Sequence, residues 1–100
     1  SLANIFTLLQ YPSKLDLTIY TDYGIFSMVK GEHKFDSFNG EQVSIISADL
    51  TIEITSTHLK YNLNNKNLTN LYCGSLNESL NDCFTLTLSH GKILVYQVFA

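Results

Sequence analysis

The closing stretch of the chain, FTLTLSHGKILVYQVFA (84–100), constrains the fold more than any other. Before His90-Gly91, apolar residues alternate with threonine and serine; after this pair, nearly every residue is apolar. The alternation predicts a half-buried strand, and the pair predicts a hairpin turn that returns as a strand apolar on both faces. Such a strand is usually central and covered on both sides. Leu94, Tyr96 and Val98 therefore need a cover, which a helix, a second sheet or a partner protein would provide.

The beginning of the chain carries a helical pattern. The apolar residues of 2–9 recur at the spacing of one helix face, and Pro12 follows as a stop. We expect a short amphipathic N-terminal helix that packs on the closing strand.

From Lys14 onward, the apolar pattern has the period of two that is typical of strands. Strand-like runs separated by polar breaks occur at 15–20, 25–30, 43–46, 50–54, 59–63, 84–88 and 92–98. The capping box Ser75–Glu78 predicts a helical turn over 76–81. Together these patterns predict an α+β fold that is mostly antiparallel β, sandwich- or barrel-like, with seven or eight short strands and one N-terminal helix.

Length and charge restrict the classes of protein. One hundred residues form one domain, 1–100, and the absence of an initiator methionine is compatible with excision from a longer chain. A net charge of −3 argues against a surface that grips a phosphate backbone. No apolar run reaches the length of a membrane helix, and no signal-peptide pattern opens the chain.

Residues that could perform chemistry are scattered. His33, His58 and His90 have no second metal ligand at a recognised spacing. The carboxylates lie at turns and outward strand positions, outside the apolar runs where burial would raise a pKa. The sequence therefore assigns no catalytic, cofactor-binding or metal-binding residue, and we expect a domain that is not an enzyme.

Exposed aromatic and apolar residues predict contact with a protein instead. Amphipathic aromatics are favoured at interfaces, and a strand left uncovered attracts a partner strand or sheet. We expect a domain for protein–protein interaction or assembly, including a homodimer. The predicted partner-binding residues are Tyr20, Tyr23, Phe26, Leu94, Tyr96 and Val98.

Two other functions stay open at this point. One is an extracytoplasmic adhesion or glycan-binding domain closed by a Cys73–Cys83 disulfide, whose spacing suits a short loop. The other is an OB-like domain that stacks single-stranded nucleic acid on its aromatic residues, which the small number of basic residues, six lysines, disfavours. Free buried cysteines are common in the cytosol, so the sequence slightly favours a cytoplasmic location.

Overall fold

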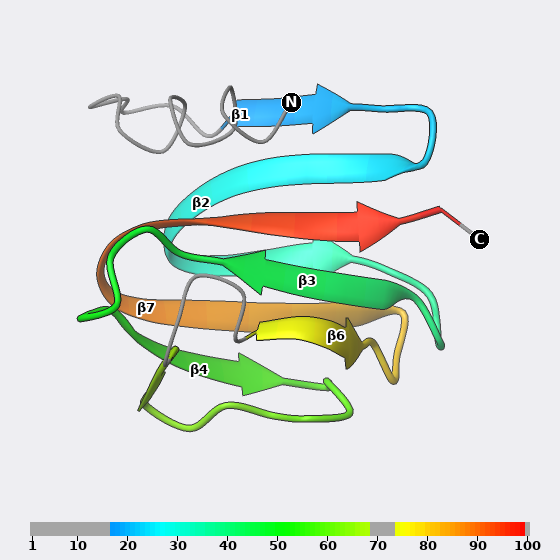
Figure 1. The fold of residues 1–100 in the computed structure, drawn as a ribbon. Helices are drawn as coiled ribbons and strands as arrows, with labels where there is room; N and C mark the ends of the chain where they lie inside the picture. The colour runs from blue at the N-terminus through cyan, green and yellow to red at the C-terminus, as the bar shows by residue number, and fades with distance from the viewer. Residues whose placement is uncertain (1–16, 69–73, 100) are drawn as a thin grey trace.

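The computed structural model describes residues 17–68 and 74–99. In this part of the chain, every regular element is a β-strand (Figure 1). The strands in chain order are β1 (Leu17–Tyr20), β2 (Gly24–Asp36), β3 (Gln42–Ile46), β4 (Glu53–Thr57), β5 (Lys66–Asn67), β6 (Gly74–Glu78) and β7 (Cys83–Val98). All of their pairings are antiparallel.

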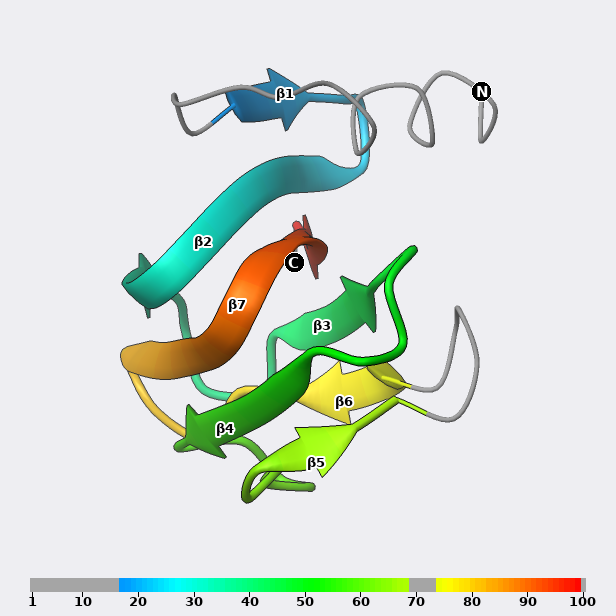
Figure 2. The ribbon, with the colours of Figure 1, turned by 90° about the vertical axis from the view of Figure 1, so that its left-hand side faces the viewer.

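The strands form two layers that share β2 and β7. Both strands are long and bent, and each contributes one half to each layer (Figure 2). The first layer has the order β1-β2-β7-β3-β6, with residues 24–30 of β2 paired to 92–98 of β7. In the second layer, residues 32–36 of β2 and then β4 flank the first half of β7, and β5 pairs with β4. The result is an antiparallel sandwich.

The bend in β7 occurs where the sequence predicts a hairpin, and that prediction is wrong. Residues 83–98 form one continuous strand, and the β2–β7 register shifts between Lys30 and Glu32. A tight type I′ hairpin needs positive φ at two successive residues. At His90-Gly91 only Gly91 has positive φ, at 68°. A single left-handed residue bends the strand into the other layer, and the chain does not reverse.

The core fills the space between the inner faces of the two layers. At the second layer, Phe35 and Phe84 lie opposite each other in register, with ring centroids 4.8 Å apart. The main cluster of buried apolar side chains comprises Val29, Phe35, Val43, Ile45, Ile52, Ile54, Leu59, Leu68, Phe84, Leu86, Leu88, Ile93 and Val95.

The outer face of the first layer is also buried around Leu94. Leu94 is buried beside its register partners Met28 and Ile46, and none of the three belongs to the main cluster. In the second layer, by contrast, Thr87 is exposed on the outer face. The two halves of β7 thus have different sequence patterns because the outer face is buried at Leu94 in the first layer and exposed at Thr87 in the second. The N-terminal helix expected as the cover falls within residues 1–16, outside the described residues.

The α+β class predicted from the sequence is wrong for the described residues, which form an all-β structure, whereas the antiparallel β organisation is confirmed. The helical turn predicted over 76–81 is wrong as well. Its residues pair with β3 as β6 and continue through a bridge between Leu59 and Ser79. Pairing on both sides of this segment outweighs the local capping signal. Within the described residues, there is no helix with the length and apolar character needed to span a membrane.

Candidate functional site

The segment that follows β4 forms a turn over residues 58–62, called here the Tyr61 turn. Its backbone is attached to β6 and its continuation: Lys60 N–H donates to Glu78 O over 2.8 Å, and Leu80 N–H donates to His58 O over 2.8 Å. Leu59 is buried in the core cluster. The turn is therefore fixed to the sandwich although it belongs to no strand.

The Asn77 side chain holds the middle of this turn. Its Oδ1 accepts hydrogen bonds from the N–H groups of Tyr61 and Glu78 over 3.1 and 2.9 Å, and its Nδ2 donates to Tyr61 O over 2.8 Å. Asn77 is only 6% exposed. One buried amide therefore binds both backbone polar groups of Tyr61.

A second asparagine holds the base of the same turn. Asn62 Oδ1 accepts hydrogen bonds from Leu59 N–H and from the Ser56 hydroxyl, each over 3.0 Å. The chain enters the turn through His58, whose φ of 61° lies in the left-handed region that is unfavourable for a residue with a Cβ. The surrounding hydrogen bonds over-determine this strained conformation, as is common at functional sites.

The Tyr61 ring projects from this fixed backbone into solvent. It is 62% exposed, and Lys60 Nζ lies 5.6 Å from its centroid, within the range of a cation–π interaction. An exposed aromatic ring on a rigid turn is suited to stack on a flat or cationic ligand.

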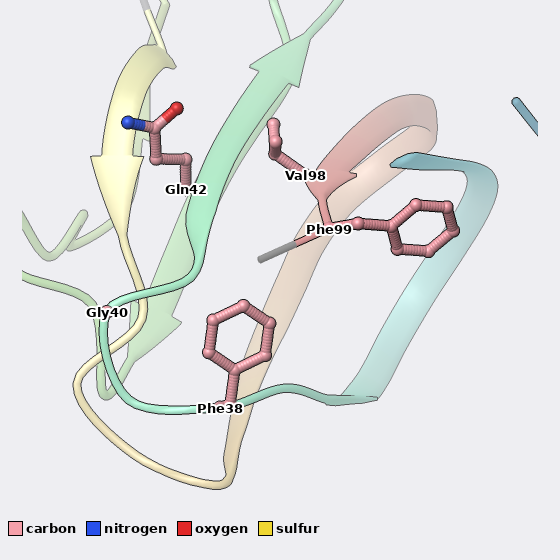
Figure 3. Close-up of a pocket in the computed structure, with 5 residues that line it drawn as sticks. All are labelled: Phe38, Gly40, Gln42, Val98 and Phe99. Carbon is pink, nitrogen blue, oxygen red and sulfur yellow. The ribbon is translucent and has the colours of Figure 1, made fainter. Parts of the chain in front are cut away.

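A shallow pocket lies on the other side of β3, between the segment 38–42 and the end of β7. Its lining residues are Phe38, Gly40, Gln42, Val98 and Phe99, and its volume is about 260 Å³. Figure 3 shows Val98 pointing toward β3 and the Phe99 ring pointing toward the start of β2. None of the lining residues carries a charge, and the volume falls below the usual range for ligand pockets, about 300–1,000 Å³.

The structure also assembles a polar network that the sequence analysis missed. The Thr51 hydroxyl lies 2.6 Å from Asp49 Oδ1 and 3.0 Å from His90 Nε2, and Ser89 Oγ lies 2.9 Å from His90 Nδ1. The hydrogen bonds from Thr51 lower the pKa of Asp49. His90 and Asp49 are both half-exposed, and Ser89 Oγ also accepts a hydrogen bond from Glu53 N–H. This solvent-exposed network ties the β3–β4 connection to the bend of β7.

Glu41 contradicts the expectation that the carboxylates stay outside buried regions. It is 7% exposed, and its Oε1 accepts a hydrogen bond from Gln97 Nε2 over 2.8 Å, which also donates to Asp36 O. Burial raises the pKa of Glu41, and the Gln97 hydrogen bond opposes this effect only in part. Its interactions are internal to the fold, so Glu41 is a structural group.

The raised pKa of Glu41 predicts a pH-dependent contribution to stability. A carboxyl group with a raised folded-state pKa stabilises the fold most below its unfolded pKa, and this contribution is lost as the pH rises through the folded pKa. Glu41→Gln keeps an acceptor for Gln97 and removes the charge. We expect the stability of the variant relative to the parent to increase from pH 4 to pH 7 in urea unfolding. If the free energies of unfolding of variant and parent differ by the same amount at both pH values, the raised pKa of Glu41 is contradicted.

The residues predicted to bind a partner fall into two groups. Phe26, Leu94, Tyr96 and Val98 share the outer face of the first layer, where Phe26 stacks on Tyr96 with centroids 4.2 Å apart and Leu94 is buried. Tyr20 and Tyr23 are exposed around the β1–β2 turn. Their role in binding a partner stays a prediction.

The predicted disulfide also stays a prediction. Cys83 is half-buried at the start of β7, and its predicted partner Cys73 lies outside the described residues. Within the described part of the chain, no group of three or more potential ligands is placed to hold a metal ion.

Comparison with known proteins places this architecture among thiamin pyrophosphokinases. The thiamin pyrophosphokinase from Bacillus subtilis is similar, with a TM-score of 0.75 and 25% identity over 97% of this chain and 48% of that chain. The enzyme from Candida albicans gives a TM-score of 0.74 and 17% identity over 98% of this chain and 40% of that one. A protein from Lactobacillus plantarum gives a TM-score of 0.76 and 16% identity over 99% of this chain and 51% of that chain. This chain thus spans about half the length of these structures. A search of curated protein sequences gives no significant match.

The comparisons overturn the function predicted from the sequence. A non-enzymatic domain for protein–protein interaction is wrong, as are the glycan-binding and nucleic-acid-binding alternatives, because the family model that matches the chain is that of an enzyme's substrate-binding domain. The family model for the substrate-binding domain of thiamin pyrophosphokinase matches residues 24–96. The chain therefore belongs to the thiamin pyrophosphokinase substrate-binding domain family.

Proposed function

We propose that this domain binds thiamin for a thiamin pyrophosphokinase, and that the Tyr61 turn forms part of the thiamin-binding surface. The family match over residues 24–96 carries the proposal. Thiamin consists of an aminopyrimidine ring and a positively charged thiazolium ring, so its recognition calls for aromatic and polar groups. Transfer of a diphosphate needs a metal ion and groups that hold phosphates. The proposal assigns only thiamin binding to this domain.

Position along the chain favours Tyr61 over the other exposed aromatic residues. Among the described aromatic side chains of residues 24–96, that of Tyr61 is the most exposed. Tyr20 and Tyr23 precede the matched range, and two of the five pocket residues, Val98 and Phe99, follow it. The substrate-binding surface of the family is therefore better represented by the Tyr61 turn than by either alternative.

The chemistry of the turn suits a cationic aromatic ligand. The Tyr61 ring can stack on a thiamin ring and attract the thiazolium charge through its π face. Lys60 Nζ already lies 5.6 Å from the ring centroid, so a positive charge is accommodated at this distance. The ring is presented by a backbone that the buried Asn77 amide holds in place, so little conformational freedom of that backbone is lost on binding.

Calorimetric titration of thiamin into the chain tests the proposal. We expect Tyr61→Ala to weaken binding about tenfold or more, since stacking on one aromatic side chain contributes roughly 1–3 kcal/mol. Tyr61→Phe should retain most of the affinity, because the ring face is kept. Tyr23→Ala, which removes an exposed tyrosine outside the matched range, serves as the control and should bind like the parent. A parent chain without affinity for thiamin, or a Tyr61→Ala variant that binds as tightly as the parent, would refute the proposal.

A further inference from the structure

We infer that Asn77 is the positioning residue of the thiamin-binding surface and acts on the ligand through the backbone of Tyr61. The inference rests on the proposed function of the Tyr61 turn and extends it to a residue that does not contact the ligand. It follows from the three hydrogen bonds of the Asn77 amide and from its burial.

Hydrogen-bond geometry gives Asn77 a specific hold on Tyr61. Tyr61 N–H donates to Asn77 Oδ1 over 3.1 Å, and Tyr61 O accepts from Asn77 Nδ2 over 2.8 Å. The planar amide thus pairs with both polar groups of a single residue, as a neighbouring strand would. With both peptide groups of Tyr61 held, the ring keeps only its own side-chain torsions.

The environment of the Asn77 amide makes direct contact with thiamin unfavourable. The side chain is buried, and Asn77 pairs in register with Val43, which is fully buried. Its Oδ1 already accepts two hydrogen bonds, the second from Glu78 N–H. Asn77 therefore contributes by ordering the turn before the ligand arrives, which lowers the cost of ordering it on binding.

Among the described residues, the second asparagine of the turn does not reproduce this role. Asn62 holds the same turn through Leu59 N–H and the Ser56 hydroxyl, but neither of these hydrogen bonds reaches the Tyr61 backbone. Removing the Asn77 amide should thus release Tyr61 while Leu59 stays anchored in the core. We expect water to replace the amide at the Tyr61 peptide groups, because Tyr61 lies at the surface, and the fold to be retained.

The first test uses thiamin titrations of Asn77→Ala and of the double variant Asn77→Ala/Tyr61→Ala. We expect Asn77→Ala alone to weaken thiamin binding about five- to tenfold, because the released Tyr61 side chain and its turn must then be ordered on binding. In the Tyr61→Ala background, the same substitution should have almost no further effect, because Asn77 acts through Tyr61. Asn81→Ala is the matched control, since Asn81 Oδ1 accepts a hydrogen bond from the neighbouring Asp82 N–H in an exposed loop. If Asn77→Ala lowers the affinity for thiamin equally in the parent and in the Tyr61→Ala variant, the inference is overturned.

The second test is hydrogen exchange of the Tyr61 amide, followed by NMR without thiamin. We expect exchange to become at least several-fold faster in Asn77→Ala, with the amides of Leu59 and Val95 unchanged. This measurement separates the inference from the proposed function. A parent chain that binds no thiamin would refute the function, and the Tyr61 amide would still decide whether Asn77 fixes the turn. Unchanged Tyr61 exchange would overturn the inference even if thiamin binds at Tyr61. Should Asn77→Ala fail to fold, Asn77→Ser replaces it in both tests.

Discussion

Phe84→Ala is expected to destabilise the domain by about 3–5 kcal/mol, the usual cost of truncating a buried phenylalanine. The Phe84 side chain is fully buried, and its ring stacks on that of Phe35 with an interplanar angle of 13°. The two residues are register partners on β2 and β7, the strands that both layers share. Truncation leaves a cavity on the inner face of the second layer, which cannot collapse without moving both strands.

Thermal and urea unfolding would measure this loss. For a domain of 100 residues, each 1 kcal/mol lowers Tm by about 4–8 °C, so a fall of 12 °C or more is expected. Phe38→Ala is the matched control, because it removes the same group from an exposed position and should change the stability by about 0.5 kcal/mol or less. Similar losses for the two variants would show that the Phe35–Phe84 pair is not central to the core.

Local patterns predicted most strands correctly because they depend on side-chain alternation alone. The runs around 25–30, 43–46 and 84–88 lie in β2, β3 and β7 as the period of two indicates. The hairpin expected at His90-Gly91 does not form because a tight turn needs positive φ at two successive residues, and of these two only Gly91 has a positive φ. A bend and a hairpin have nearly the same sequence signature at this point.

The candidate site was harder to predict, because non-local contacts define it. The alternation of Leu59, Tyr61 and Leu63 predicted a strand over 59–63, but residues 58–62 form a turn, in which His58 has a left-handed φ and the Tyr61 backbone is hydrogen-bonded to Asn77. Asn77 was expected in a helical turn because a capping box is a local signal. Sixteen positions separate Asn77 from Tyr61, so no local pattern connects them. Glu41 is buried for the same reason: its partner Gln97 comes from the far end of the chain.

The largest effect of a single charge is expected for Leu94→Asp. Leu94 is 2% exposed on the outer face of the first layer, and its register partners there are Met28 on one side and Ile46 on the other. Both neighbours are apolar, so the new carboxylate would be buried without a partner. A buried unpaired charge costs several kcal/mol, and we expect a loss of about 3–5 kcal/mol at pH 7 in urea unfolding.

The pH dependence of Leu94→Asp distinguishes burial from other causes of instability. Burial raises the pKa of a carboxyl group, so the folded state tolerates the neutral form better than the charged form. The loss should therefore be smaller at pH 4 than at pH 7, since protonation removes the buried charge. Thr87→Asp, on the exposed outer face of the same strand, should cost about 0.5 kcal/mol or less at either pH. If Leu94→Asp unfolds like the parent at pH 7, the outer face of the first layer is open to solvent. The outer faces of the two halves of β7 then do not differ in solvent exposure.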